Sequence, residues 1–211
     1  MAASLRCCLR VRCHKRIKCK PAPFVANVMK GVFVMENSRF STRQLTMCAL
    51  LAAMVAVLAA LAVTTNAVKV TFESFPIYIA GFLLGPECGL AVGTLGTFIY
   101  QMLMYGFSAT TALWILPYSI LGLVCGLYAR KHNYDLSAKQ YFVMTMLCEF
   151  MVTILNTGTI YIDSHIYGYY TPALIIGALG LRLLICFTKG AVFGGIMPKL
   201  ISTVRRAVVQ N

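Results

Sequence analysis

Residues 88–129 form a stretch of 42 residues without a single Asp, Glu, Lys or Arg. A water-soluble surface requires charged side chains far more often than this. The stretch is also too long for one membrane crossing, because a hydrocarbon core about 30 Å thick takes about 20 helical residues. Its polar, turn-like centre lies at residues 105–111. We therefore interpret the stretch as two membrane helices joined by a short loop, in an integral membrane protein.

The composition of the whole chain indicates the same class. It is 59% hydrophobic and 12% charged, whereas about 25% of the residues are charged in an average soluble domain. We predict an all-α protein of the cell membrane, in which residues 35–211 form one domain of six transmembrane helices. The expected spans are residues 45–63, 76–84, 88–104, 112–129, 140–162 and 172–199.

Two segments depart from regular spans. The second span is about half the usual length, so it is tilted, re-entrant or extended by loop residues. Residues 64–74 alternate apolar and β-branched residues with polar ones, which predicts an extended segment rather than a helix.

The distribution of Lys and Arg predicts the orientation in the membrane, because these residues favour the cytoplasmic side of short loops. With a cytoplasmic N-terminus, Lys69 is the one basic loop residue of the domain that lies outside. The basic residues inside are then Arg39, Arg43, Arg130, Lys131, Lys139, Lys199, Arg205 and Arg206. This predicts two cytoplasmic termini and outer loops at residues 64–75, 105–111 and 163–171.

Residues 1–34 differ from the rest. They hold eight of the 19 Lys and Arg, no acid, and four of the nine Cys. Such a leader is typical of a transit peptide or of a disordered basic tail, and the segment is equally interpreted as a mis-assigned extension upstream of a natural start at Met35. Its Cys spacing fits no standard zinc pattern, and the other five Cys are scattered through apolar segments. We predict no metal site, no disulfide and no cofactor.

Three charged residues lie inside the expected spans: Glu149, Arg182 and Lys189. A charge at the centre of a membrane helix costs about 2.5–3.5 kcal/mol, so each requires a partner or a function. Glu149 and Lys189 lie at similar depth on adjacent antiparallel helices, which favours an ion pair over a proton relay. Arg182 lies about 15 Å below the outer end of its helix. Its guanidinium suits a carboxylate of a ligand, or it makes structural hydrogen bonds to Asn156 and Thr157.

The third outer loop is dense in aromatic and hydrogen-bonding residues. Tyr residues commonly lie at a membrane interface, but such a cluster beside polar groups also suits a flat, polar organic ligand. We expect aromatic rings to stack on that ligand, Asn156 to hydrogen-bond its edge, and Lys69 and Arg182 to compete for its carboxylate. The candidate substrate-binding residues are Lys69, Trp114, Asn156, Tyr161, His165, Tyr167, Tyr169 and Arg182.

The first span is rich in alanine, with Ala-xxx-Ala pairs at 49/53, 52/56 and 56/60. Small residues four apart let membrane helices approach closely. The pattern is therefore interpreted either as tight packing within this protein or as an exposed groove for another membrane protein.

Together these features resemble the substrate-binding S components of energy-coupling factor (ECF) vitamin transporters. The resemblance covers about residues 40–205 and rests on six short spans, the alanine-rich first helix, and the segment 75–86, which is similar to the Phe-x-Pro-Ile opening and Gly-Pro ending of the family's second helix. Within the family the chain is most similar to the folate group, through Asn156-Thr157 and Arg182. It departs from that group in the loop at residues 105–117, so pantothenate, another vitamin precursor or a different heterocycle remain alternatives to folate.

The resemblance implies a function. S components bind a vitamin from outside with high affinity, and then dock on a membrane T component that two ABC-type ATPases drive. In the family, the alanines of the first helix form the docking surface, which corresponds here to Ala49, Ala53, Ala56 and Ala60. The resemblance places the vitamin among the outer loops and the outer ends of the last three spans.

Two other classes of function stay open: a solitary, ion-coupled carrier of small molecules, and a membrane scaffold whose alanine-rich helix binds a partner. An enzyme is disfavoured, because the sequence has no phosphate-binding Gly-rich Lys motif, no H-E-x-x-H and no G-x-S-x-G. We expect the lipid bilayer, a vitamin and the transporter subunits as partners, and no nucleic acid.

Overall fold

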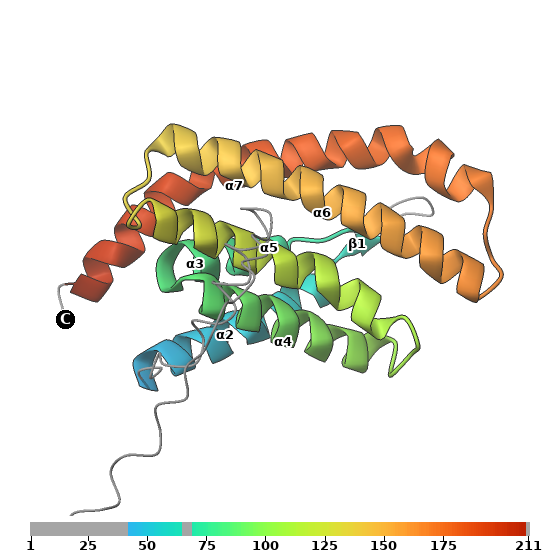
Figure 1. Ribbon diagram of the computed structural model, residues 1–211, viewed down its shortest axis with the longest axis horizontal. Coiled ribbons are helices and arrows are strands. Elements are labelled where there is room, and N and C mark those ends of the chain that lie inside the picture. Colours follow the sequence, from blue (N-terminus) through green and yellow to red (C-terminus); the bar gives the residue numbers. More distant parts are fainter. Residues whose placement is uncertain (1–41, 65–68, 210–211) are drawn as a thin grey trace, which may run out of the picture. The chain divides into compact units, whose positions relative to one another are not determined.

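The protein is described here from a computed structural model, which covers residues 42–64 and 69–209 (Figure 1). The basic leader, residues 1–34, lies outside the described residues. The elements are α2 (Thr42–Ala60), β1 (Val63–Thr64), β2 (Lys69–Val70), α3 (Ser74–Leu84), α4 (Pro86–Met104), α5 (Thr111–Lys131), α6 (Ala138–Ile166), the π-helical turn η2 (Ala173–Gly177) and α7 (Ala178–Val209).

Four of the described helices are long and apolar enough to cross a membrane: α2, α5, α6 and α7. They correspond to four of the predicted spans. The predicted second span is α3, whose 11 residues fall short of the roughly 20 that a crossing takes. The predicted third span, α4, is not in this group. The helical, membrane-embedded class is confirmed, and the number of crossings stays a prediction.

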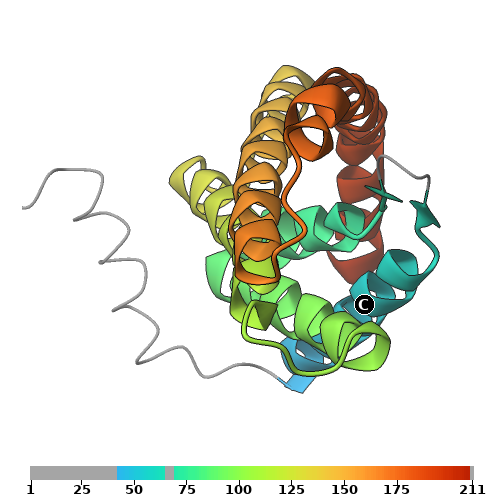
Figure 2. The same cartoon turned by 90° about the vertical axis from the view of Figure 1, so that its right-hand side faces the viewer.

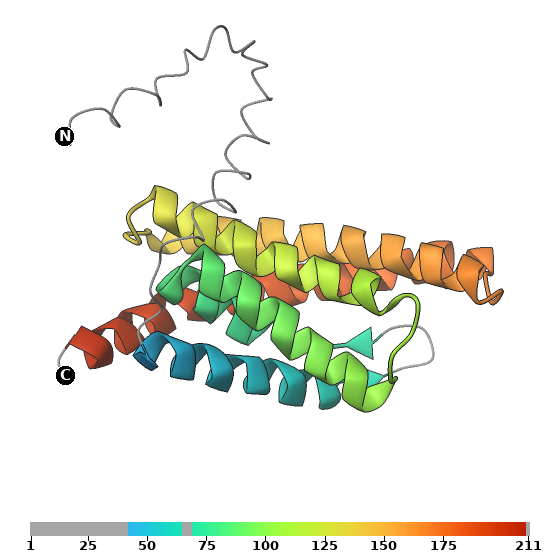
Figure 3. The ribbon, with the colours of Figure 1, turned by 60° about the horizontal axis from the view of Figure 1, so that its bottom comes forward.

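The helices fall into two groups. In one, α6 packs along α7, and the two run side by side in opposite directions (Figure 1). In the other, α2, α3 and α5 pack around α4, as Figure 3 shows from below. The α5–α6 contact and a smaller α3–α7 contact join the groups.

Glycines bring α4 and α5 into backbone contact. A Cβ placed on Gly122 would lie 2.0 Å from the carbonyl oxygen of Gly89, and a Cβ on Gly93 would lie 2.3 Å from that of Tyr118. No other residue type fits at such a distance, and close approach through small residues is how helices pack tightly in lipid. We call Gly89, Gly93 and Gly122 the glycine seam.

A single residue, Gly85, separates α3 from α4. It adopts a φ of 101°, a region that glycine enters without the steric cost of a side chain. Pro86 is the first residue of α4. Its lack of an N–H costs no hydrogen bond there, because N–H groups of the first helical turn have no acceptor within the helix. The short α3 therefore ends in a sharp turn directly into α4.

The outer end of α6 extends further than the sequence predicted. The third outer loop was expected from residue 163, but α6 continues to Ile166, so that boundary was wrong. The helix ends at Tyr167, after which Gly168 has a φ of 73° and the Tyr169 N–H donates to the carbonyl oxygen of Ser164 at 3.1 Å. This is the bond of a Schellman motif, and it gives the Ser164 carbonyl of the last helical turn a donor. The motif places the end of the helix beyond the predicted boundary.

The predicted extended segment before α3 is present as a short hairpin. β1 and β2 pair antiparallel, with Val63 opposite Val70 and Thr64 opposite Lys69. The expected extended character is confirmed at Thr64, Lys69 and Val70, while residues 65–68 lie outside the described residues. Val63 was expected in the first span, which was wrong, because α2 ends at Ala60 and Val63 pairs in β1.

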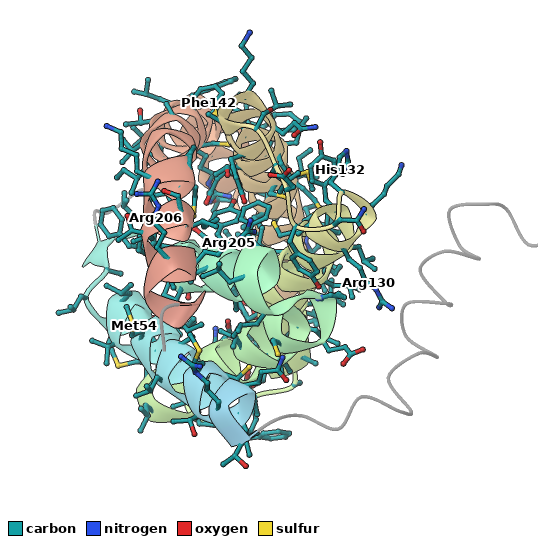
Figure 4. The ribbon with its side chains drawn as sticks, turned by 90° about the vertical axis from the view of Figure 1, so that its left-hand side faces the viewer. Met54, Arg130, His132, Phe142, Arg205 and Arg206 are labelled. Atoms are coloured by element: carbon teal, nitrogen blue, oxygen red, sulfur yellow. The ribbon has the colours of Figure 1, made fainter. Side chains whose placement is uncertain are left out.

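Basic residues gather at the end of the bundle where α5 and α7 finish. Figure 4 shows Arg130 and His132 from one helix end beside Arg205 and Arg206 from the other. The Arg205 guanidinium donates to the carbonyl oxygen of Tyr134 in the α5–α6 loop, which ties the end of α7 to that loop. We call this the basic end, and the opposite end, with the α4–α5 loop and the α6–η2 loop, the aromatic end.

Candidate functional site

A cavity of about 600 Å³ lies toward the aromatic end of the bundle. Its walls come from α4, α5, α6 and α7, and from the segment that leads into α3. Figure 2 looks onto this end, with α6 and α7 on one side and α2 and α4 on the other. The volume falls within the range of small-molecule sites, and most of the side chains around it are aromatic, hydroxylated or charged.

A proline in α5 allows an additional hydrogen bond between α5 and α6. Pro117 has no N–H, so the Leu113 carbonyl lacks its usual intrahelical donor. The Thr159 hydroxyl of α6 donates to that carbonyl oxygen instead, at 3.2 Å. This bond holds α5 and α6 together beside the cavity.

An ion pair lies on the α6–α7 side of the cavity. The Nζ of Lys189 is 3.2 Å from Oε2 of Glu149, and the two side chains are 13% and 2% exposed. The other carboxylate oxygen, Oε1, accepts from the Ser74 hydroxyl at 2.6 Å and from the Tyr78 hydroxyl at 3.1 Å. The predicted ion pair is confirmed, and its carboxylate has the additional donors that a buried pair requires.

Arg182 lies higher on α7 and lines the cavity, half-buried. Its Nη1 donates to the Thr157 hydroxyl oxygen at 3.4 Å, which is one of the two structural bonds that the sequence suggested. That Arg182 binds a ligand stays a prediction.

Three of the predicted aromatic residues line the cavity: Trp114, Tyr167 and Tyr169. Asp163 joins two of them, because its carboxylate accepts from the Trp114 indole N–H at 3.4 Å and from the Tyr169 hydroxyl. Burial, and then the hydrogen bond and charge of Asp163, raise the pKa of Tyr169 to about 12. Asp163 therefore fixes the aromatic wall on both α5 and the α6–η2 loop.

The two other predicted aromatic candidates lie elsewhere. Tyr161 and His165 stack on each other, with ring centroids 4.3 Å apart, and His165 also lies 4.3 Å from the ring of Tyr170. Neither is among the residues around the cavity. Lys69 lies in β2, where its backbone pairs with that of Thr64. That Lys69 binds a ligand stays a prediction.

Asn156 lines the cavity as predicted, and it belongs to a group of polar residues that the sequence analysis missed. Its Nδ2 donates to the Tyr118 hydroxyl oxygen at 3.3 Å. Glu73 also lines the cavity, and its carboxylate accepts from the Thr71 hydroxyl at 2.8 Å. Glu73 and Asp163 are 4% and 8% exposed.

A periodic signal in the sequence would have located part of this site. The α6 residues around the cavity include Thr153, Asn156, Ile160 and Asp163, which recur at the three- and four-residue spacing of one helix face. Polar residues repeated on one face of a membrane helix indicate a polar interior. No such period marks Glu73, which lies in the segment before α3.

The alanine-rich helix uses its small residues on two faces. Ala49, Ala53 and Ala60 are exposed, whereas Ala56 is buried in a cluster with Ala59 and Tyr100. The interpretation as packing within this protein therefore holds for the buried face, which includes Ala56, one of the residues expected on the docking surface. That a partner docks there stays a prediction.

Comparison with known proteins identifies a family. Residues 39–204 match the sequence model of the family described as ECF-type riboflavin transporter, S component. This range contains α2 to α6 and most of α7, and hence all the residues that surround the cavity. No curated protein matches the sequence.

Proposed function

Because the chain belongs to the ECF-type riboflavin transporter S component family, we propose that it captures a vitamin at the outer side of a cell membrane for an ATP-driven transporter. Members of this family are membrane-embedded transporter subunits rather than enzymes, so the chain is a membrane protein of vitamin transport. Its four long apolar helices agree with this. The observation that carries the proposal is the cavity of about 600 Å³ with its aromatic wall.

The charges around the cavity favour an uncharged vitamin. Among the described residues that surround it, three are carboxylates (Glu73, Glu149 and Asp163) and two are cations (Arg182 and Lys189). Lys189 is already paired with Glu149. A ligand with two carboxylates would therefore face an excess of like charge, which costs binding free energy in a poorly solvated site.

We infer that the substrate is riboflavin or a closely similar flat heterocycle. Riboflavin carries an uncharged three-ring system, which suits Trp114, Tyr167 and Tyr169, and a chain of hydroxyls, which suits Thr153 and Thr157. Folate, which the resemblance of the sequence favours, is the second candidate. Arg182 supports folate, because its guanidinium matches one carboxylate, but the dianionic tail of folate would need a second cation.

The topology follows from the same arrangement. We propose six crossings within residues 35–211, including the short α3 and the glycine-rich α4, with both termini in the cytoplasm. Arg130, Arg205 and Arg206 support this orientation, because the basic end lies opposite the cavity and basic residues favour the cytoplasmic side.

A binding measurement on the full chain, purified in detergent, tests the substrate. We expect stoichiometric quenching of riboflavin fluorescence at submicromolar concentration, and no displacement by a tenfold excess of folate. Displacement by folate would reverse the choice of vitamin. Failure to bind either compound would favour a weak ion-coupled carrier or a scaffold protein instead.

The proposed partners are a membrane T component and two ABC-type ATPases, which dock on the exposed face of α2. Ala53→Leu should abolish vitamin uptake by cells and leave binding by the purified subunit intact, because Ala53 is exposed and the added bulk fills only the docking surface. Ala191→Leu, at an exposed alanine of α7, is the matched control and should transport normally. Uptake that continues after deletion of the ATPases would indicate an ion-coupled carrier.

A further inference from the structure

We propose that Thr97 and Gln101 of α4 bind the hydroxyl chain of the vitamin, so that this helix selects an uncharged, polyhydroxylated ligand. The inference rests on the proposed function, namely that the cavity binds riboflavin or a closely similar heterocycle. It adds a fourth helix to the binding residues, because no substrate-binding residue was expected on α4 from the sequence.

The hydroxyl of Thr97 is buried at the cavity without a partner. Thr97 is 1% exposed and lies among the residues around the cavity. Within the described part of the chain, its Oγ1 makes no hydrogen bond. A buried hydroxyl left without a partner is costly, and a ligand hydroxyl placed against it would remove that cost.

Several threonines of the bundle satisfy their hydroxyls within their own helix. Those of Thr94 on α4 and of Thr153 and Thr157 on α6 donate to the backbone carbonyl four residues earlier, at 2.8, 2.8 and 2.7 Å. This is a common arrangement for a threonine inside a helix. The corresponding acceptor of Thr97 is the carbonyl of Gly93, to which its hydroxyl makes no bond. The hydroxyl hydrogen of Thr97 is therefore available to a ligand.

Gln101 continues the same face of α4 toward the aromatic end. It lies four residues after Thr97, which places both side chains on one side of the helix. Gln101 also lines the cavity and is 8% exposed. Its amide carries two N–H donors and a carbonyl acceptor, so it is able to meet a ligand hydroxyl in either sense. Neither side chain is charged, which favours a chain of hydroxyls over a carboxylate tail.

Close packing on two sides fixes the rotation of α4. A Cβ on Gly93 would lie 2.3 Å from the carbonyl oxygen of Tyr118 in α5. A Cβ on Gly96 would lie 2.5 Å from the Cβ of Val55 in α2. The helix cannot turn Thr97 away from the cavity without opening these contacts, so the hydroxyl is in place before the ligand arrives.

The α4 and α6 sides of the cavity complement each other chemically. Thr153 and Thr157 line the cavity too, but their hydroxyl hydrogens are donated within α6, so they meet a ligand as acceptors. Thr97 and Gln101 add donors, and α4 lies on the other side from α6 (Figure 2). A hydroxyl chain between the two helices would find both kinds of partner while the ring stacks on the aromatic wall.

Riboflavin and lumiflavin separate the hydroxyl chain from the ring. Lumiflavin has the same three-ring system, with a methyl group in place of the chain. A site built to hydrogen-bond a ligand hydroxyl loses affinity for an analogue that lacks it. The unmodified full chain in detergent should therefore bind riboflavin at least about tenfold more tightly than lumiflavin, the factor to which about 1.4 kcal/mol corresponds.

Variants at Thr97 test the hydroxyl itself. Thr97→Val keeps the shape of the side chain and should bind riboflavin about tenfold less tightly, with lumiflavin affinity within about twofold of the unmodified protein. Thr97→Ser keeps the hydroxyl, so both affinities should stay within about threefold. Gln101→Met removes the amide and should show the same selective loss as Thr97→Val.

Thr145→Val is the matched control. The Oγ1 of Thr145 is also buried without a hydrogen bond to a described residue, but Thr145 is not among the residues around the cavity. Neither flavin affinity should change in this variant. Partition of lumiflavin into detergent is the same for every variant, so it cancels when variants are compared.

An equal loss for both flavins in Thr97→Val would overturn the proposal, because it would trace the loss to the ring or to the shape of the cavity. Unchanged riboflavin affinity in Thr97→Val or in Gln101→Met would overturn it too. So would equal affinities of the unmodified protein for the two flavins, a measurement that requires no variant to fold. A protein that binds riboflavin but fails these tests refutes this inference alone, whereas one that binds neither flavin refutes the proposed function as well.

Discussion

Helices α4 and α5 touch at one part of their length and stand apart at another. Along the glycine seam their backbones are in contact, and a side chain on Gly122 would have no room. Toward the aromatic end the corresponding residues are large: Tyr100 and Gln101 on α4 and Trp114 on α5 line the cavity. One helix pair thus provides both a tightly packed core and part of the cavity wall, and the side chains are small in the first region and large in the second.

The two regions also differ in the polarity of the residues around them. At the glycine seam the neighbours are apolar, whereas the cavity contains carboxylates and cations. The Glu149–Lys189 pair connects α6 and α7 to α3, because Glu149 also accepts from Ser74 and Tyr78. The comparison therefore predicts that changes at this connection and in the glycine seam affect stability, while changes higher in the cavity affect binding.

The largest effect is expected at the ion pair. Lys189→Met leaves the buried Glu149 without its counter-charge, and removing one partner of a buried pair costs about 3–5 kcal/mol. We expect a corresponding loss of stability in denaturant unfolding of the detergent-solubilised protein. The double variant Glu149→Gln/Lys189→Met removes both charges and should recover much of it, and Thr188→Met, at an exposed neighbour, serves as control. Stability unchanged in Lys189→Met would show that the pair does not hold α3 against α6 and α7.

The next effect concerns the glycine seam. Gly122→Ala places a methyl group 2.0 Å from a backbone oxygen, which must force α4 and α5 apart. We expect a destabilisation of about 3 kcal/mol, the upper end for overpacking, because backbone yields less readily than a side chain.

The matched control for that substitution is Gly158→Ala on α6, where a Cβ would meet no described atom within 4 Å. Alanine should stabilise the helix there by up to about 1 kcal/mol. If both variants lost stability equally, close packing would not distinguish the seam from the rest of the bundle.

A smaller effect is expected inside the cavity. Arg182→Ala should weaken vitamin binding by about 2 kcal/mol if its guanidinium donates to the ligand, while the thermal stability changes little. Isothermal titration with riboflavin and with folate measures this. A loss confined to folate would identify Arg182 as a carboxylate contact, and unchanged affinity for both would place Arg182 outside the site.

The smallest effect lies at the aromatic end and depends on pH. The pKa of Tyr169 is about 12 in the folded protein, against an ordinary value of 10.0, so the folded state holds this proton more tightly than the unfolded chain. Its contribution to stability is complete below pH 10 and is lost as the pH rises toward 12. We expect a slight additional decline in melting temperature over that window, and Tyr169→Phe should remove it. A decline of equal size in both proteins would assign it to other groups.

Much of the fold could be read from the sequence, because a bilayer imposes strong constraints on length and hydropathy. The boundaries of α4 and α5 came out within two residues of those predicted. The outer end of α6 did not, since Gly168 closes a Schellman motif beyond an aspartate that looked like the start of a loop. Local turn chemistry, rather than hydropathy, set that boundary.

The site was predicted in part for a different reason. Arg182 was selected by its charge and depth, Asn156 as a hydrogen-bonding residue and Trp114 as an aromatic ring, and all three line the cavity. Tyr161 was selected as an aromatic ring too, yet it lies beside His165 and away from the cavity. Depth along a helix follows from counting residues, whereas the face that a residue occupies depends on the packing of the neighbouring helices.

By itself, then, the sequence determined that the chain is a helical membrane protein, since long charge-free segments are stable only where they are shielded from water. It also determined that Glu149 and Lys189 pair, because isolated charges are too costly at that depth. Only the tertiary structure decided that Tyr118 and Asn156 are hydrogen-bonded and that Glu73 lines the same cavity. These residues come from three elements far apart in the sequence, and no local pattern encodes the directions in which their side chains meet.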